Sequence, residues 1–328
     1  MQYPPWPKTA VVGSGAVGCY FGGMLARAGA PVTLIGRAKH VEAFNRDGLR
    51  METNRFRETV PISASTDIAA AGEAQLVLFC VKSIDSEPVA KSLAPHLAPD
   101  ALILDLQNGV DNVPRICSQV RNPVIAAVVY VACEMIGAGC VKHHGRGDLV
   151  IGSIDTGDGR ALPAREQLDE LAGQLARADI PCVISDNIEG DLWLKFLINC
   201  AYNAVSALGR SRYARMTAIG ESHRVMEDAV REVLAVAHAS GVRMPAGDSL
   251  RTAMKLADAM PQQLSSMAQD LDRGKRTEID DLNGAVVRRG EALGIPTPVN
   301  RTLHGLVKLL ESGKSGEGGL RAAESDGT

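Results

Sequence analysis

The sequence predicts an α/β protein with two domains, an N-terminal domain built on a mainly parallel sheet and an all-helical C-terminal domain. A glycine-rich loop near the N-terminus joins a short apolar run to a helical stretch. Continuous apolar runs follow it, and these are typical of parallel strands buried on both faces. From Asn187 onward only helical periodicity is present. At 328 residues the chain exceeds the size at which one core keeps growing, so two domains are expected.

The glycine-rich loop has the spacing G-x-G-x-x-G. The first glycine permits a tight turn, the second lets the backbone approach a pyrophosphate, and the third lets helix pack against strand. Residues 10–12 predict a buried strand and residues 16–28 predict a helix, whose N-terminus favours a phosphate. This context favours a dinucleotide-binding Rossmann domain over a chance glycine-rich turn. The expected cofactor contacts in the loop are Gly13, Ser14, Gly15, Ala16, Val17 and Gly18.

The end of the next strand indicates which dinucleotide is bound. Residues 31–36 predict this strand, and Arg37 follows it, with Lys39 and His40 close behind. A carboxylate at this position accepts a hydrogen bond from the ribose of NAD, whereas an arginine accommodates the 2′-phosphate of NADP. The sequence therefore predicts NADP(H), although a solvated arginine at a strand end is the alternative.

Two further apolar runs each lead into a polar residue. Residues 75–81 predict a strand that ends at Lys82, and residues 101–106 predict a strand followed by Asn108. Open α/β sheets bind ligands at the carboxyl ends of their parallel strands. We therefore expect Lys82 and Asn108 to contact cofactor or substrate.

The rest of the first domain is predicted from alternation and turn residues. Residues 50–61 suggest a hairpin or edge strands, and residues 161–178 suggest a helix. Further strands are expected at 124–132, at 140–154 around a turn at 144–148, and at 180–185. His143 and His144 are adjacent, so in a strand they point to opposite faces and cannot jointly hold a metal.

The second domain begins near Asp186, where strand patterns stop. The expected division is residues 1–186 for the dinucleotide domain, 187–312 for the helical domain and 313–328 for a disordered tail without apolar periodicity. Helices are expected at 188–208, 216–240, 247–259, 265–273, 277–293 and 300–310.

The first helix of this domain carries a polar stripe on an otherwise apolar surface. Lys195, Asn199 and Asn203 follow one another at intervals of four residues, so they share one helix face. A helix that is apolar nearly all round is buried, so these groups need partners or a wet site. Burial would lower the pKa of Lys195 and make it a usable proton donor; the alternative is a lysine that reaches solvent. Cys200 beside the stripe is expected to be a buried structural thiol.

Two other positions allow both a structural and a functional interpretation. Thr277 is a plausible N-cap, which would place Glu278 in the first turn of a helix, where the dipole favours a carboxylate. Ser265 and Ser266 precede another helical pattern, and a cap is again the simple interpretation. Periodicity alone does not favour a functional role for these residues over a capping role.

Composition narrows the class of partner. The formal net charge of −3 gives no reason to expect nucleic acid or an anionic membrane. No apolar run reaches the length of a membrane span, and no signal-peptide pattern precedes the first strand. The seven cysteines are scattered without C-x-x-C pairs, which fits reduced thiols and no metal site in a cytoplasmic protein.

Six motifs occur in the order seen in ketopantoate reductases, which are also called 2-dehydropantoate 2-reductases. They are GSGAVG, CVKSID, LQNGVD, DLWLKFLINCAYN, LSSMAQDL and RTEIDDLNG. The chain resembles that family from about Thr9 to Leu310. The resemblance implies a Rossmann domain and a helical domain similar to that of 6-phosphogluconate dehydrogenase. It also implies NADPH-dependent reduction of 2-dehydropantoate to pantoate, on the route to coenzyme A.

The resemblance assigns roles residue by residue. It implies that Lys195 is the proton donor and that Glu278 touches cofactor and substrate. It places Asn199, Asn203 and Ser266 among the substrate contacts, and Lys82, Asn108 and Ala132 among the cofactor contacts.

The chain departs from the family pattern at Ala204, Val205, Ser206, Tyr213 and Gln263. These positions are expected to line the substrate site, so they weaken the substrate assignment more than the reaction class. Reduction of another branched 2-oxo acid remains open, as does a non-catalytic NADP-binding sensor. The expected partner is a small 2-oxo acid, and a homodimer stays open.

Overall fold

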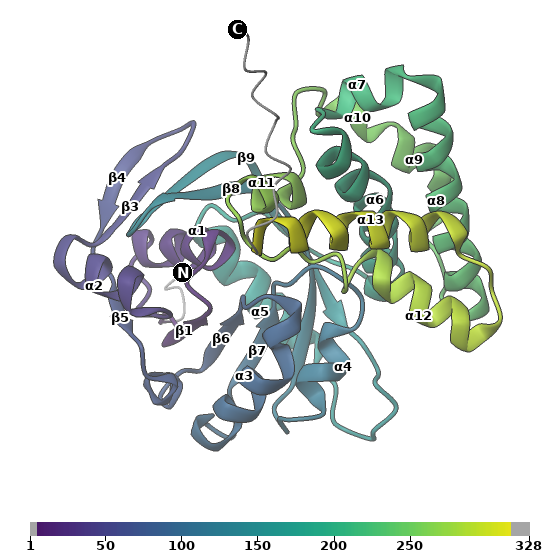
Figure 1. Cartoon of the computed structure of the whole chain (residues 1–328). Helices are drawn as coiled ribbons and strands as arrows, with labels where there is room; N and C mark the ends of the chain where they lie inside the picture. The colour runs from purple at the N-terminus through teal and green to yellow at the C-terminus, as the bar shows by residue number, and fades with distance from the viewer. Residues whose placement is uncertain (1–4, 316–328) are drawn as a thin grey trace, which may run out of the picture. The chain divides into compact units, whose positions relative to one another are not determined.

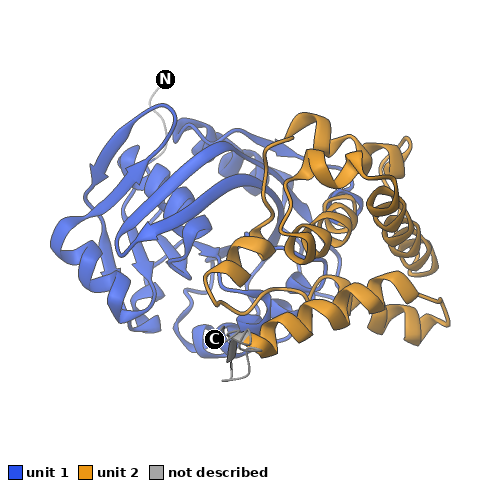
Figure 2. Ribbon diagram, turned by 45° about the horizontal axis from the view of Figure 1, so that its top comes forward, with its two compact units in different colours: residues 1–192 blue, residues 193–328 orange. Residues whose placement is uncertain are grey.

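The computed structural model describes residues 5–315 as two compact units that divide between Leu192 and Trp193 (Figure 2). The first unit is α/β and the second is all-helical, which confirms the predicted fold class (Figure 1). The division falls inside α6 (Ile188–Gly209), just after the boundary expected near Asp186. The expected tail starts at 313, but α13 (Pro298–Ser315) includes its first residues; residues 316–328 lie outside the described part.

The described strands form one ten-stranded sheet in the order β4-β3-β9-β8-β7-β6-β1-β2-β5, with β10 paired to β9. β1 pairs in parallel with β2 and β6, and β7 and β8 continue the parallel series. The chain crosses to the other side of β1 between β5 and β6, and such a switch point is where open sheets bind ligands. The central strands are β1 (Thr9–Val12), β2 (Val32–Ile35), β5 (Ser63–Ser65), β6 (Leu76–Phe79) and β7 (Leu102–Asp105).

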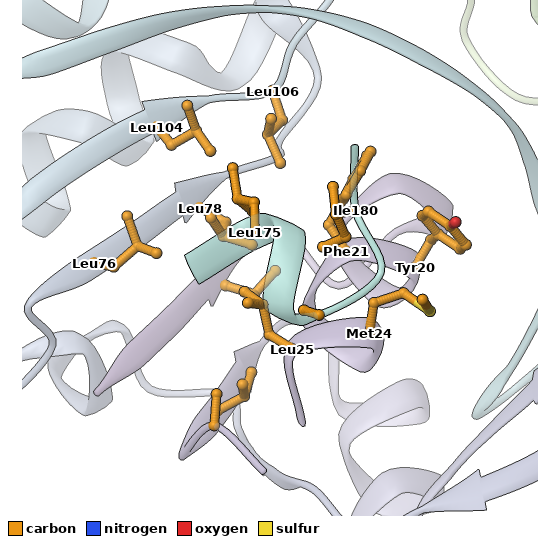
Figure 3. Packing of buried hydrophobic residues seen from close by; sticks show 14 of the residues in the cluster. Tyr20, Phe21, Met24, Leu25, Leu76, Leu78, Leu104, Leu106, Leu175 and Ile180 are labelled. Carbon is orange, nitrogen blue, oxygen red and sulfur yellow. The ribbon is translucent and has the colours of Figure 1, made fainter. Parts of the chain in front are cut away.

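Helices cover both faces of this sheet because alternate residues of each buried strand point to opposite sides. Leu76 and Leu78 of β6 pack with helices α1 and α5 (Figure 3), whereas Val77 and Phe79 pack with α3 and α4. The helices of this unit are α1 (Ala16–Arg27), α2 (Ala38–Asp47), α3 (Ser86–Leu93), α4 (Asn112–Cys117) and α5 (Arg165–Arg177). Short 3₁₀ helices lie at η1 (Ile68–Ala71), η2 (Ser83–Asp85) and η3 (Ala94–His96).

At the end of the sheet formed by β4, β3, β9 and β8, one prediction is confirmed and one is wrong. The expected hairpin within 50–61 is confirmed, since β3 (Leu49–Glu52) pairs antiparallel with β4 (Arg57–Val60). The expected turn at 144–148 is wrong, because these residues lie inside a long strand. The strands concerned are β8 (Val124–Gly137), β9 (Cys140–Ser153) and the short β10 (Cys182–Ile184).

The pairing of β8 with β9 explains that correction. The register shifts near Arg146, whose φ is 59°, and Gly147, whose φ is 121°. Such irregularities are β-bulges, which bend a strand without ending it. The true turn is at 138–139, where Gly139 has φ 71°. The glycines that resemble a turn in the sequence therefore serve a bulge.

The second unit packs its helices around a core that includes Phe196, Tyr202, Val233 and Val286. The helix expected over 216–240 divides in two, because Ile219 is extended. Within residues 5–315, no helix has the length and apolarity that a membrane span requires. The remaining helices are α7 (Tyr213–Ala218), α8 (Gly220–Ala239), α9 (Ser249–Met254), α10 (Leu256–Ala259), α11 (Ser266–Asp272) and α12 (Asn283–Leu293).

Candidate functional site

The three glycines of the loop between β1 and α1 each have a different surrounding. Gly13 has φ 104°, and a Cβ there would lie 2.7 Å from the carbonyl carbon of Cys80. A Cβ on Gly18 would lie 2.3 Å from the carbonyl oxygen of Gly13. A Cβ on Gly15 would meet no described atom within 4 Å. Two glycines are therefore required by the protein itself, and the third keeps a space open.

That space lies at the N-terminus of α1. The first N–H groups of a helix have no intrahelical partner, and Gly15, the N-cap, has no side chain that could accept from them. The first turn of α1 contains no acidic residue. The loop is held in place because the N–H groups of Gly13 and Ser14 both donate to the Ile35 oxygen, at 3.0 and 3.1 Å. Open space beside fixed N–H groups fits the pyrophosphate of a dinucleotide.

The end of β2 lies directly against this loop. A Cβ on Gly36 would lie 1.7 Å from the hydroxyl oxygen of Ser14, so only glycine allows this approach. Arg37 follows as the N-cap of α2, and both Arg37 and Lys39 are exposed. The segment 36–40 contains no carboxylate. The strand end beside the loop thus presents cations and lacks the acid that a bare ribose hydroxyl prefers.

The structure brings Lys82 and Asn108 to the same sheet edge as the glycine loop, because β1, β6 and β7 are neighbours. Both residues are half-buried. The loops that carry them are joined, since the Ser83 hydroxyl donates to the Asn108 carbonyl oxygen at 3.0 Å. The buried Gln107 amide donates to the Val81 oxygen at 2.7 Å. Sequence reasoning missed that Gln107 connects the two loops, although Gln107 stands beside Asn108 in the same motif.

Ala132 lies farther along the sheet. It is half-buried on β8, whose parallel pairing with β7 ends at Ala126. At about 3.3 Å per residue, Ala132 is roughly 20 Å along the strand from that point. It pairs with Gly145 of β9 at the irregular stretch. Ala132 therefore lies farther beyond the paired strand ends than Lys82 and Asn108 do along their own segments, and its contact with a cofactor stays a prediction.

The polar stripe of α6 is present as predicted. Lys195 and Asn199 are half-buried, and Asn203 is only 5% exposed. In the described part of the chain, neither asparagine amide has a side-chain hydrogen bond. An amide side chain can both donate to and accept from a polar ligand, so the pair suits the oxygens of such a ligand. Burial raises the pKa of Cys200 well above its ordinary value, which supports its interpretation as a structural thiol.

The N-terminus of α11 is attached to this stripe. Ser265 is the N-cap, because its hydroxyl accepts from the Ala268 N–H at 3.1 Å, and the capping interpretation is confirmed for it. The same hydroxyl donates to the Asn203 carbonyl oxygen at 3.2 Å. Ser266 is the first residue of α11 and is exposed. The second unit therefore holds Ser266 near Asn203.

The positions that depart from the family pattern are largely internal. The buried Ser206 hydroxyl donates to the Ser211 oxygen at 2.8 Å and accepts from the Ser265 N–H at 3.2 Å. Tyr213 is buried against Tyr202, with ring centroids 4.7 Å apart. Ser206 and Tyr213 thus take part in the packing of α6, α7 and α11.

Glu278 is half-buried, and it does not lie in a helix. The helix expected from Thr277 begins only at Asn283, because Leu282 takes φ −102° and ψ −102°. Thr277 is therefore not the N-cap of α12. Its hydroxyl instead accepts from the Ile279 N–H and donates to Glu311. Sequence reasoning missed Glu311, since nothing local links it to a residue 34 positions away.

Comparisons with known proteins show the family that the chain matches. The family model "Ketopantoate reductase PanE/ApbA" matches residues 9–156, and its C-terminal model matches residues 187–311. A 2-dehydropantoate 2-reductase of Archaeoglobus fulgidus is 32% identical over 93% of this chain and 98% of that protein.

Two solved structures are similar over almost the whole chain. A PanE/ApbA family ketopantoate reductase from Ralstonia eutropha is 50% identical, with a TM-score of 0.87 over 94% of this chain and 100% of that one. A complex of D-mandelate dehydrogenase with NADH is 25% identical, with a TM-score of 0.82 over 93% and 99% of the two chains.

Proposed function

The chain belongs to the ketopantoate reductase PanE/ApbA family of oxidoreductases, and from this membership we propose that it reduces 2-dehydropantoate to pantoate with NADPH. The observation that carries the proposal is the α6 stripe, where two asparagines without side-chain partners follow Lys195 at helical spacing. A ketone with neighbouring oxygens needs such donors, and a proton must arrive as its oxygen gains charge.

The first unit would hold the cofactor. The N–H groups at the start of α1 would bind the pyrophosphate, and Arg37 would pair with the 2′-phosphate. Lys82, Asn108 and Ala132 would make further contacts with the dinucleotide. When bound, the nicotinamide supplies the hydride that reduces the C2 ketone.

The second unit would hold the substrate and supply the proton. The Lys195 ammonium donates a proton to the ketone oxygen, so that hydride and proton together give the 2-hydroxy acid. Asn199 and Asn203 would bind hydroxyl or carboxylate oxygens, and Ser266 would bind the carboxylate. Glu278 would accept a hydrogen bond from the substrate hydroxyl and orient it.

A second candidate is the reduction of a different, bulkier 2-oxo acid. The changes at Ser206, Tyr213 and Gln263 favour it, because they alter the packing of α6, α7 and α11. The likeness to D-mandelate dehydrogenase points to an aromatic 2-oxo acid, and also to NADH as the competing cofactor.

Replacement of the lysine tests the proposed reaction. Lys195→Ala should lower kcat by about 100-fold or more, the range for loss of a general acid, while NADPH affinity changes little. Lys255→Ala is the matched control, since Lys255 is an exposed lysine of the same unit at the end of α9. Wild-type turnover in Lys195→Ala would reject the assignment.

A further inference from the structure

The turn that carries Glu278 is bonded on both sides to one carboxylate. The N–H and the hydroxyl of Thr277 each donate to Oε1 of Glu311, both at 2.7 Å. The N–H of Ile279 donates to the Thr277 hydroxyl oxygen at 3.2 Å. The residues before and after Glu278 are thereby tied, directly and through one hydroxyl, to Glu311 on α13.

Asp280 attaches the same turn to α13 a second time. His304 Nε2 lies 2.7 Å from one carboxylate oxygen, and Lys308 Nζ lies 2.8 Å from the other. Arg276 also donates to Asp280, at 3.1 Å. Burial raises the pKa of Asp280, but these hydrogen bonds outweigh burial and hold the pKa well below its usual range. Asp280 is therefore ionised at neutral pH and remains bound to α13.

The three α13 residues share one face of the helix. His304, Lys308 and Glu311 are spaced by four and three residues, and we call them the α13 polar stripe. Lys308 Nζ also lies 3.4 Å from Oε2 of Glu311, so Lys308 bridges the two carboxylates. All three side chains of the α13 polar stripe contact residues of the turn at 276–280.

Helix α13 is itself a firmly held support. The carboxylate of Glu232 on α8 accepts from the N–H groups of Val299 and Asn300, at 2.8 and 2.9 Å, at the start of α13. The Asn300 side chain accepts from Asn283 of α12 at 2.9 Å. Working groups keep their geometry best when rigid elements support them in this way.

We propose that Glu311 is a positioning residue, which holds the Glu278 carboxylate in its working orientation through Thr277. The inference rests on the role proposed for Glu278 in substrate binding. A purely stabilising carboxylate needs only a cation, and Lys308 supplies one. Glu311 instead binds the backbone immediately before Glu278, and its side chain is only 14% exposed. The turn therefore takes its shape from α13 rather than from a helix of its own.

Removal of the carboxylate should release the turn. In Glu311→Ala the buried Thr277 loses the acceptor of both its donors. A displacement of about 1 Å at a reacting group lowers rates by as much as 100-fold, so kcat/KM should fall by roughly 10- to 100-fold. Glu311→Gln keeps an acceptor oxygen of the same reach, and it should restore kcat/KM to within roughly threefold of wild type.

A double-mutant cycle separates positioning from general stability. Glu311→Ala is measured alone and in a Glu278→Gln background, with NADPH and 2-dehydropantoate. If Glu311 acts through Glu278, its loss lowers kcat/KM in the wild type and has almost no effect in the Glu278→Gln protein. An equal loss in both backgrounds, or no loss in the wild type, overturns the proposal. Wild-type kcat/KM in Glu278→Gln alone would instead refute the proposed function of Glu278.

Hydrogen exchange supplies a readout that needs no activity. The Thr277 and Ile279 amides should exchange at least about tenfold faster in Glu311→Ala, whereas the β1 amides keep their rates. Unchanged exchange at Thr277 and Ile279 would overturn the proposal.

Two further sets of variants complete the test. Glu291→Ala is the matched control, because Glu291 pairs with Arg301 of α13 at an exposed site outside the turn; it should leave both readouts unchanged. If Glu311→Ala fails to fold, Thr277→Val replaces it in the double-mutant cycle with Glu278→Gln. This variant removes the Thr277 hydroxyl and keeps the backbone N–H. Thr277→Ser, which keeps the hydroxyl, should then restore activity.

Discussion

Alanine at two glycines of the same loop should separate cofactor binding from folding. Gly15 has φ −81° and ψ −169°, which any residue adopts, and an added Cβ meets no described atom within 4 Å. Gly15→Ala should therefore fold normally, with a stability change within about 1 kcal/mol and a small gain from the less flexible unfolded chain. Its methyl group would occupy the space that a pyrophosphate needs.

The surroundings of Gly15 and Gly13 set the expected loss of NADPH affinity and the expected loss of stability, respectively. A phosphate pushed away from Gly15 loses about two charge-assisted hydrogen bonds of roughly 1.5 kcal/mol each, or roughly 100-fold in Kd for NADPH. Gly13→Ala places its Cβ 2.7–2.8 Å from backbone atoms of Cys80 and Val81 at φ 104°. Strain of about 1–2 kcal/mol and overpacking of about 1–3 kcal/mol should lower the free energy of unfolding by roughly 2–5 kcal/mol.

Two assays on each variant check this contrast. Urea unfolding of the protein without cofactor gives stability, and NADPH fluorescence titration gives Kd. We expect Gly15→Ala to be as stable as wild type and defective in binding. Destabilisation of Gly15→Ala to the level of Gly13→Ala would refute the reasoning, and so would wild-type NADPH affinity in Gly15→Ala.

Three further outcomes are expected. Arg37→Ala should weaken NADPH binding about 10- to 100-fold, as loss of a charged hydrogen bond does, and leave NADH affinity nearly unchanged; equal effects in titrations of both cofactors would contradict the NADP assignment. Asp280→Asn should reduce stability by about 2 kcal/mol at pH 7. Because the folded-state pKa of Asp280 is lowered, its contribution is full above the unfolded value near 3.9 and is lost as pH falls through the lower folded value. The difference in urea midpoint between Asp280→Asn and wild type should therefore be constant from pH 7 to about pH 5 and begin to narrow by pH 3. A difference that widens on acidification would contradict this prediction. Ser206→Ala leaves the buried Ser265 N–H without its acceptor, so KM for the oxo acid should rise about tenfold while NADPH affinity in a parallel titration stays constant.

Much of the first unit could be predicted because its signals are local or follow from sheet topology. Gly13 and Gly18 are required by contacts within the loop or with the adjoining strand, so their spacing is visible in the sequence. Lys82 and Asn108 could be placed together because parallel strands share one carboxyl edge. In the second unit, the polar stripe of α6 was predictable as well, since helical periodicity alone aligns its residues.

The errors occur where distant contacts decide the local structure. The segment around Arg146 has the composition of a turn, but pairing with β8 across the sheet keeps it in a strand. The turn at Glu278 has the pattern of a helix start, but its backbone bonds to Glu311 instead. Neither partner is marked by spacing or composition, so neither outcome could be obtained from the sequence alone.

The most direct test of the proposed function is steady-state NADPH oxidation by the purified protein with 2-dehydropantoate and a panel of other 2-oxo acids, including phenylglyoxylate. We expect kcat/KM for 2-dehydropantoate to be at least about 10⁴ M⁻¹s⁻¹, the lower end for efficient enzymes, and to exceed the value for every other acid. A preference for phenylglyoxylate would replace the substrate and retain the reaction class. NADPH that binds but is not oxidised with any 2-oxo acid would contradict the assignment of this chain as a reductase.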